Sequence, residues 1–466
     1  MAKKTFLIAV CLAIMSPAVF AKDEEAGKVV PLRLKTVIYT AYANNKDIQI
    51  QEQNLKVSKA QILGAKAEFL PTLNLGYEYT HNGAVLKVPG LENKKTDVGV
   101  LTGFQNDNQL TATINQTVYN GGANIANLKQ SLLGLNTSEV TLLAKKLDIE
   151  FEAKRLYYGL LLAYETERIA QELVDQAQAH YDDVLRKYDQ GTSSRFDVLQ
   201  SKVEVSLLIP QLVTAKNSID LIMAELKKLL GLKLKDTITV DERLNYTLID
   251  IKEEEFLKEA YLNQPEMMLK ALGIDISKWS IEMAKAGWRP QVNAFGTYLY
   301  ASNDVGDMIN PRHRNWQTGV SVNMPIFDAW SSRAKVDEAK AKYRQAILEK
   351  GNVSDQIAVD IRRACLDLKQ SSAIIDSQKD NIAEAKEALR IAIVSYDNGV
   401  GTNLDVLDSQ TSLAQAEQTY CQGMYDYLMA EAYLDRTRGK SYLWHLAQSE
   451  GPVQLSVQEA KDEKKN

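Results

Sequence analysis

Two short acidic segments carry the most evident chemistry of this sequence. Asp405 and Asp408 follow a turn at Gly399, and Asp197 follows a similar turn at Gly191. Carboxylates in the first turn of a helix stabilise the helix dipole. Carboxylates held close together in a narrow site also repel one another, and a bound cation relieves that repulsion. The residues alone leave both interpretations of Asp405 and Asp408 open.

The two segments are copies of one pattern, 208 residues apart. The matched stretches are Tyr188-Asp189-Gln190-Gly191 with Tyr396-Asp397-Asn398-Gly399, and Asp197-Val198-Leu199 with Asp405-Val406-Leu407. In each copy the glycine predicts the end of a helix, because glycine adopts the left-handed conformation of a C-terminal cap without steric cost. Ser194 and Thr402 are the predicted N-caps of the helices that follow. The pattern therefore predicts one tight turn between helices, made twice.

No residue pattern typical of a catalytic or metal site accompanies these turns. The four histidines are His81, His180, His313 and His445. They are scattered and lack the spacing of metal ligands. The sequence also contains no glycine-rich phosphate loop and no nucleophile elbow. We therefore expect no catalytic residue, cofactor or metal, and an enzyme is the weaker interpretation.

The N-terminus predicts export. Lys3 and Lys4 precede an apolar run, and the run ends near the small residue Ala21. This is the pattern of a secretory signal peptide over residues 1–21. Its removal changes the formal net charge from −5 to about −7, which argues against nucleic acid as a partner. The mature chain keeps Cys365 and Cys421, and the sequence leaves open whether they pair.

Long helices flank both turns. They are predicted over residues 123–188, 194–230, 331–396 and 402–435. Apolar residues repeat every seven positions, as at Ile149, Leu156, Ala163, Ala170, Ala177 and Val184, and again at Ile361, Leu368, Ile375, Ile382, Leu389 and Tyr396. Such a repeat predicts knobs-into-holes packing. Helices of this length favour an extended coiled coil over an ordinary bundle, and Pro210 should kink the second helix.

Apolar and polar residues alternate in four shorter stretches, 73–79, 110–119, 292–300 and 319–327. Alternation predicts strands with one apolar face. Each pair of strands follows a helical pattern, 32–70 or 265–287, that ends at Pro71 or Pro290. Polar loops are predicted between the strands of each pair.

The chain thus divides into repeats. We predict a signal peptide (1–21), a first repeat (22–230), a small insertion (231–264), a second repeat (265–437) and a partly disordered C-terminal segment (438–466). The fold class is mainly α with a small β part. Four strands leave two open sheet edges, which invite pairing. Membrane-spanning sheets must close into a barrel, so several chains would have to contribute strands.

The sequence with these features resembles the TolC-like outer-membrane efflux proteins. The likeness covers nearly the whole mature chain. It is carried by both turns, by the strand starts Leu70-Pro71 and Arg289-Pro290, and by the strand ends Val118-Tyr119-Asn120-Gly121-Gly122 and Pro325-Ile326-Phe327-Asp328. The resemblance implies a homotrimer with a 12-stranded barrel in the outer membrane and an α-helical barrel in the periplasm. It also implies an exit duct for efflux or type I secretion that works with a periplasmic adaptor and an inner-membrane transporter.

The resemblance also assigns roles to residues of the two turns. Asp405 and Asp408 match the acidic residues of the periplasmic aperture, and Tyr396 and Asp197 match contacts that hold the gate closed. Some relatives carry arginine where this chain has Gly401, so either that contact is absent or Arg195 supplies it. The alternative function is a periplasmic coiled-coil adaptor or scaffold without a barrel. Small drugs, metal ions and secreted proteins all remain open as cargo.

Overall fold

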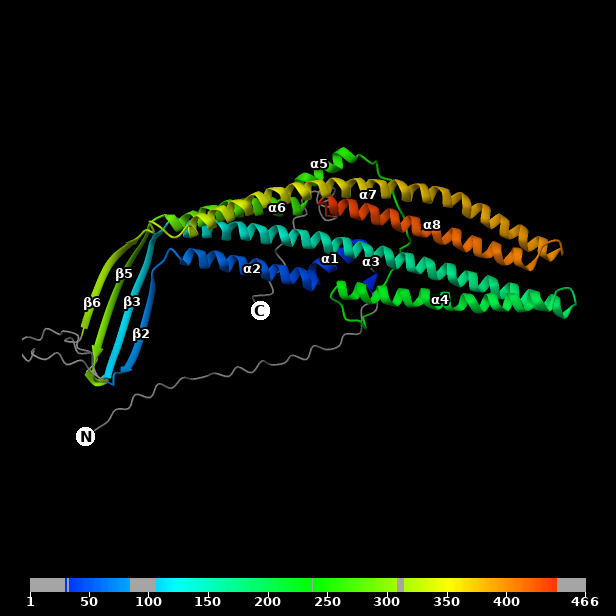
Figure 1. Cartoon of the computed structure of the whole chain (residues 1–466). Coiled ribbons are helices and arrows are strands. Elements are labelled where there is room, and N and C mark those ends of the chain that lie inside the picture. Colours follow the sequence, from blue (N-terminus) through cyan, green and yellow to red (C-terminus); the bar gives the residue numbers. More distant parts are fainter. Residues whose placement is uncertain are drawn as a thin grey trace, which may run out of the picture.

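A computed structural model describes residues 30–31, 33–83, 106–236, 238–240, 242–307 and 314–441. The molecule is elongated: a four-stranded sheet lies at one end, and two helical hairpins end together at the other (Figure 1). The predicted signal peptide and residues 442–466 of the predicted C-terminal segment lie outside the described residues. Within those residues, no helix combines the length and the apolar character needed to cross a membrane.

The sheet is antiparallel, with the strand order β2-β3-β5-β6. Its strands are β2 (Thr72–His81), β3 (Asn106–Asn120), β5 (Gln291–Ser302) and β6 (Arg314–Asn323). Three of them confirm the predicted strands. The fourth predicted strand, 319–327, has the wrong bounds. Strand β6 begins five residues before it and ends before Pro325. Proline lacks the N–H that a strand would donate.

The two faces of the sheet differ in polarity. Hydrogen-bonded register aligns Leu73, Ile114, Gly296 and Thr318 in one row across the four strands, and Leu75, Ala112, Tyr298 and Trp316 in the next row on that face. The row between them faces the other way and contains Asn74, Thr113, Thr297 and Gln317. One face is therefore largely apolar and the other polar. Among the described residues, β2 and β6 each pair on one side only.

Each hairpin consists of a long and a shorter helix. The first contains α3 (Ala123–Asp189) and α4 (Arg195–Leu229), and the second contains α7 (Ser331–Asp397) and α8 (Asn403–Thr437). Every bound of the second pair lies 208 residues after its counterpart in the first. The four predicted helices are thus confirmed to within two residues at each end. Helix α4 continues through Pro210.

Shorter elements join these hairpins to the sheet. They are α1 (Leu34–Asn44), α2 (Lys46–Ala67), α5 (Glu253–Asn263), α6 (Pro265–Lys285), the 3-10 turns η1 (Ala286–Trp288) and η2 (Val305–Asp307), and the short strands β1 (Val30–Pro31) and β4 (Ile238–Thr239). Strand β4 lies within the predicted insertion, and it pairs with β1 in parallel.

The single helix predicted over 32–70 is wrong, since the chain breaks between α1 and α2. Asn45 has extended backbone angles, φ −64° and ψ 127°. Its Oδ1 accepts from the N–H of Asp47 at 2.9 Å, and its Nδ2 donates to the carbonyl of Leu229 at 3.0 Å. The side chain therefore caps α2 and fastens the break to the end of α4.

The long helices α3 and α7 run through the whole helical part (Figure 1). In the half next to the sheet they pack with the shorter helices in the row α2-α3-α6-α7, and in the far half the row is α4-α3-α8-α7. In that far half, α4 and α7 form the two edges of the row.

Two separate apolar cores stabilise the helices. The larger core joins α1, α3, α4, α7 and α8 in the middle of the molecule, with Leu160, Leu226, Ile361 and Leu368 at most 1% exposed. The smaller core lies near the far end of α7 and α8 and consists of Leu389, Ala392, Val406 and Leu413. The partly buried ring of Tyr396 packs against this smaller core.

A buried charged cluster lies beside the larger core. The Nζ of Lys154 is 3.1 Å from Glu150 and 3.3 Å from Asp435. Glu150 also accepts hydrogen bonds from the hydroxyls of Tyr42 and Ser441, both at 2.8 Å. Burial opposes the charge of Lys154, but Asp435 and Glu150 hold the pKa of Lys154 above its ordinary value. The cluster ties α1, α3 and the end of α8 together.

Cys365 and Cys421 are both free and buried. In the antiparallel pair α7–α8, Gly423 lies against Ile374 and Ile375. This register separates Cys365 from Cys421 by roughly eleven residues along the helices, or about 17 Å. A disulfide requires Cα atoms within about 7 Å, so the two cysteines do not pair within one chain.

Candidate functional site at the two helix turns

Both hairpins end in the same turn. Gly191 and Gly399 have φ values of +79° and +71°, the left-handed conformation that the sequence predicts for them. The N–H of Thr192 donates to the carbonyl of Lys187 at 2.8 Å, and the N–H of Val400 donates to that of Ser395 at 2.9 Å. These bonds satisfy carbonyls left over at the helix ends. The turns are thereby fixed in equivalent geometries.

The helices that follow begin with capping boxes. Ser194 Oγ accepts from the N–H of Asp197 at 3.1 Å, and Asp197 Oδ2 accepts from the N–H of Ser194 at 3.2 Å. Thr402 and Asp405 repeat this exchange at 3.2 and 2.8 Å. Hydrogen bonds from the hydroxyl and N–H of Thr402 hold the pKa of Asp405 below its ordinary value. The predicted N-caps are thus confirmed, and Asp405 has the structural role of a helix-start acid.

Asp408 differs from Asp405. Its side chain is exposed, and among the described residues its carboxylate has no hydrogen bond or ion pair. It is one of the residues that line a groove of about 380 Å³ between α4 and α8. Apolar side chains line much of that groove, including Phe196, Leu199 and Leu404, which are 71%, 53% and 50% exposed. The carboxylate of Asp408 is therefore open to solvent at this end of the molecule.

Tyr396 lies where the two hairpins meet. Its ring packs edge-to-face against His180 of α3, with centroids 5.3 Å apart. The Nζ of Lys187 lies 4.3 Å from the centre of the same ring. Lys187 also forms ion pairs with Asp397 at 2.7 Å and with Asp183 at 2.9 Å. Burial opposes the charge of Lys187, but Asp397 and Asp183 raise its pKa. These contacts hold the end of α7 to the end of α3.

A buried amide makes a second connection between the hairpins. Asn403, 3% exposed, accepts hydrogen bonds at Oδ1 from His180 Nε2 at 2.7 Å and from Ser201 Oγ at 3.1 Å. Its Nδ2 donates to Gln200 Oε1 at 3.2 Å. Asn403 thereby joins α8 to both α3 and α4. No sequence pattern predicted these residues, although His180, three residues after Ala177 in the apolar seam, was a signal of a buried polar partner.

The structure does not bring the expected gate residues together within one chain. The contacts of Tyr396 run to His180 and Lys187, and Asp197 accepts from Ser193 and Ser194. Tyr396 belongs to α7 and Asp197 to α4, the opposite edges of the helix row. A direct contact between them would have to join neighbouring chains.

Arg195 and Gly401 stand apart from these contacts. Arg195 is exposed and forms no ion pair with any described residue. At Gly401 a Cβ atom would lie 3.0 Å from the Cβ of Ser395 and 3.1 Å from the backbone nitrogen of Tyr396. The backbone therefore passes close to α7 at the position where the resemblance implies an arginine in some relatives. Whether Arg195 replaces that arginine across a chain boundary stays a prediction.

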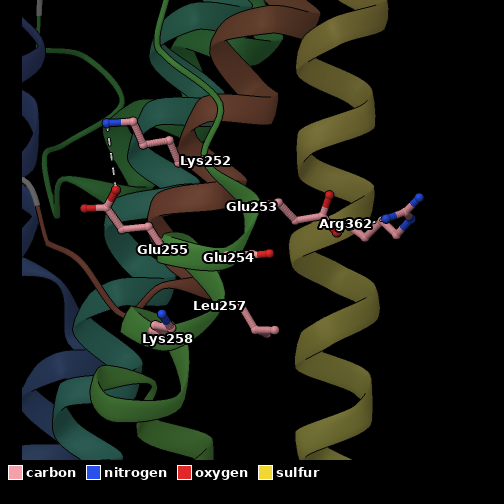
Figure 2. A pocket seen from close by; sticks show the side chains of 7 residues that line it. All are labelled: Lys252, Glu253, Glu254, Glu255, Leu257, Lys258 and Arg362. Atoms are coloured by element: carbon pink, nitrogen blue, oxygen red, sulfur yellow. Dashed lines mark hydrogen bonds and ion pairs between the residues drawn. The ribbon is translucent and has the colours of Figure 1, made fainter.

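A second concave region lies midway along the molecule, between α5 and α7. Figure 2 shows the charged side chains that line this pocket of about 820 Å³. Glu253 of α5 pairs with Arg362 of α7 at 3.1 Å, and Lys252 lies 4.0 Å from Glu255. Acids in the first turn of α5 also stabilise its dipole. These pairs account for most of the pocket's charge, and no group of metal-binding residues occurs in the described part of the chain.

Comparison with known proteins relates this architecture to one family. A family model described as "Outer membrane efflux protein" matches residues 37–232 and 256–440. The chain is 19% identical to outer membrane protein TolC of Escherichia coli over 422 residues, which cover 87% of this chain and 82% of TolC. It is 22% identical to the probable efflux pump outer membrane protein TtgC of Pseudomonas putida, over 92% of this chain and 87% of TtgC.

A third relative is matched over a shorter region. Alkaline protease secretion protein AprF of Pseudomonas aeruginosa is 21% identical over 281 residues, which cover 60% of this chain but only 58% of AprF. Two solved structures share the fold. The Campylobacter jejuni CmeC outer membrane channel has a TM-score of 0.76 at 17% identity, covering 97% of this chain and 98% of CmeC. Outer membrane protein VceC of Vibrio cholerae has a TM-score of 0.74 at 18% identity, covering 88% of this chain and 96% of VceC.

Proposed function

Because this chain belongs to the outer membrane efflux protein family, we propose that it is the outer-membrane exit duct of an export system. In this proposal three copies form one channel, which receives cargo from an inner-membrane transporter through a periplasmic adaptor. The names of the relatives include both efflux and protease secretion. Efflux and type I secretion are therefore both within the proposed function.

The two faces of the sheet carry this proposal. A sheet with an apolar and a polar face fits a barrel wall, in which the apolar side faces lipid and the polar side faces water. Strands β2 and β6 each pair on one side within the described chain, and lipid cannot satisfy open edges. Neighbouring copies can satisfy them, and three copies of four strands give the 12-stranded barrel that the resemblance implies.

The helix row supports the same assembly. Its edges carry exposed apolar side chains, among them Leu199, Val203 and Leu207 on α4 and Val359, Leu366 and Ile391 on α7. Contact of the α4 edge of one copy with the α7 edge of the next is a head-to-tail contact, which forms a ring if the rotation closes. The helical part would then continue the channel into the periplasm.

Reconstitution tests the proposed function. We expect the mature protein to require detergent, to have the mass of a trimer, and to produce discrete conductance steps in planar lipid bilayers. Barrel closure should also make its electrophoretic mobility depend on heating. The alternative, a periplasmic adaptor or scaffold, predicts a water-soluble protein without conductance, and that result would overturn the proposal.

We propose that Asp405 and Asp408 line the aperture at the periplasmic end. Three copies would place up to six carboxylates around one axis, where repulsion favours a bound cation. The double substitution Asp405→Ala, Asp408→Ala should weaken block of the channel by multivalent cations and reduce its cation selectivity in single-channel recordings.

Asp405→Ala also removes the acceptor of the hydrogen bonds that Thr402 donates in the capping box, and a hydrogen bond of this kind contributes about 0.5–1.5 kcal/mol. Asp408→Ala alone serves as the control for that loss, because the carboxylate of Asp408 has no partner among the described residues. Retention of full cation block by both variants would place the constriction elsewhere.

We further propose that Tyr396 and Asp197 of neighbouring copies meet in the closed state. A hydrogen bond to a charged acceptor contributes about 1.5–3 kcal/mol. Tyr396→Phe keeps the ring against His180 and Lys187 and removes only the donor. We expect higher resting conductance for Tyr396→Phe and for Asp197→Ala, with little further gain in the double variant because the two residues share one interaction.

Tyr188→Phe is the matched control, since Tyr188 occupies the equivalent position in the first repeat and is 41% exposed. Additive effects of the Tyr396 and Asp197 substitutions, or no effect of either, would exclude this pair from the gate.

A further inference from the structure

His180 connects the two hairpins through a single titratable ring. The ring projects from α3, packs against Tyr396 of α7, and hydrogen-bonds Asn403 of α8. Asn403 in turn bonds Ser201 of α4, which is fully buried. Separation of the α7–α8 end from the α3–α4 end would break the His180 contacts. Any separation of the two hairpin ends must therefore break the contacts of the His180 imidazole with Tyr396 and Asn403.

The surroundings of His180 favour its neutral form. The side-chain oxygen Oδ1 of Asn403 can only accept, so Nε2 of His180 donates and Nδ1 is the site that a second proton would occupy. Asp183 and Lys187 face the ring from α3, and Asp397 and Tyr396 face it from α7. The groups contributed by α8 and α4, namely Asn403, Gln200 and Ser201, are uncharged.

The acidic neighbours of His180 are already engaged. Asp183 and Asp397 both pair with Lys187, at 2.9 and 2.7 Å. An imidazolium at position 180 would therefore share these two carboxylates with an ammonium group, in a partly buried position. Burial and, to a smaller extent, the charge of Lys187 lower the pKa of His180 below its ordinary value of 6.5. Together they outweigh the opposing effects of Asn403, Asp183 and Asp397.

We propose that His180 is a pH-sensitive latch, which holds the two hairpin ends together while it is neutral and releases them when it is protonated. This inference rests on the proposed channel function and adds a regulatory input to it. A proton at Nδ1 would charge a ring that is partly withdrawn from water, whereas separation of the hairpins returns the ring to solvent. Acid in the periplasm would therefore favour the open state of the channel.

The direction of the pH effect on the latch, and the pH range in which it occurs, follow from the linkage between proton binding and hairpin separation. The separated state binds a proton near pH 6.5, and the latched state binds it only at lower pH, so the separated state binds more protons as the pH falls. The latch is fully effective above about pH 6.5 and weakens below it. At pH 5.5 an exposed imidazole is about ten parts protonated to one part neutral, which limits the shift to about elevenfold for each chain.

Single-channel recording of the purified full-length protein between pH 7.5 and 5.5 tests this proposal. Carboxylates of ordinary pKa, near 3.9 to 4.3, stay ionised over this range. We expect the resting open probability of the unmodified protein to rise several-fold on acidification. His180→Gln, which can still donate to Asn403 but cannot titrate, should abolish the rise.

His81→Gln is the matched control, because His81 lies at the end of β2 in the sheet, and it should leave the rise intact. If His180→Gln does not assemble as a trimer, His180→Asn provides a second non-titrating donor. Channels that show no rise, or a rise that these variants retain, would overturn the latch and leave the channel function standing. Absence of any channel would overturn both.

Discussion

A lysine in place of Ile114 should prevent the chain from assembling in the membrane, whereas a lysine in place of its neighbour Thr113 should be tolerated. Ile114 lies in the apolar row with Leu73 and Gly296, near the middle of β3, and Thr113 lies on the polar face. A lysine on the lipid face near the bilayer midplane costs about 2–4 kcal/mol. Three copies carry that cost three times in one barrel.

Val322→Lys should also reduce assembly in the membrane, but by less than Ile114→Lys. Val322 is paired with Val292, and β6 ends one residue later at Asn323. The position is therefore nearer to the membrane interface, where the cost falls to about 0–1 kcal/mol. Ser321→Lys, on the opposite face, is its matched control.

The measurement is the fraction of each variant recovered as heat-modifiable trimer from outer membranes. We expect the order Thr113→Lys and Ser321→Lys, then Val322→Lys, then Ile114→Lys, from most to least assembled. Equal assembly of Ile114→Lys and Thr113→Lys would show that the apolar face does not contact lipid.

The second large effect is expected from Lys154→Met. This substitution keeps most of the side-chain volume but removes the positive charge between Glu150 and Asp435, at 3.1 and 3.3 Å. Loss of one partner from a buried ion pair leaves an uncompensated charge and costs about 3–5 kcal/mol. The loss should appear as a lower midpoint in urea unfolding, measured at one protein concentration because oligomers are stabilised by mass action.

Lys129→Met on the same helix is the control, since Lys129 is exposed and has no ion pair among the described residues. Its effect should stay within about 0.5 kcal/mol, as for most surface substitutions. Equal midpoints for the two variants would mean that the cluster around Lys154 contributes nothing to stability.

Much of the helical architecture could be predicted because the same helix and turn pattern occurs twice in the sequence. The turn glycines, the capping residues and the heptad seam each predict the same helix ends, and both copies agree. Local signals of this kind require no knowledge of distant residues. The presence of four strands in the main sheet, and their apolar face, were predictable for the same reason, since alternation is local.

The failures arose where distant residues decide the local structure. The break at Asn45 is stabilised by the carbonyl of Leu229, which no local pattern reveals. The bounds of β6 depend on pairing with β5 from Gln291 to Tyr300. The candidate site was predicted only in part for the same reason. His180 and Asn403 lie 223 positions apart in the sequence, and only the fold brings them together.

The small core at the far end of α7 and α8 has a consequence for the energy landscape of the chain. Leu389, Ala392, Val406 and Leu413 pack apart from the larger core, so this end can form its own cooperative unit. Such units open locally at free energies below that of global unfolding. Amide hydrogens around Val406 should therefore exchange faster than those around Leu368. We therefore expect the hairpin end to change position more readily than the middle of the molecule, because its core is separate from the larger one.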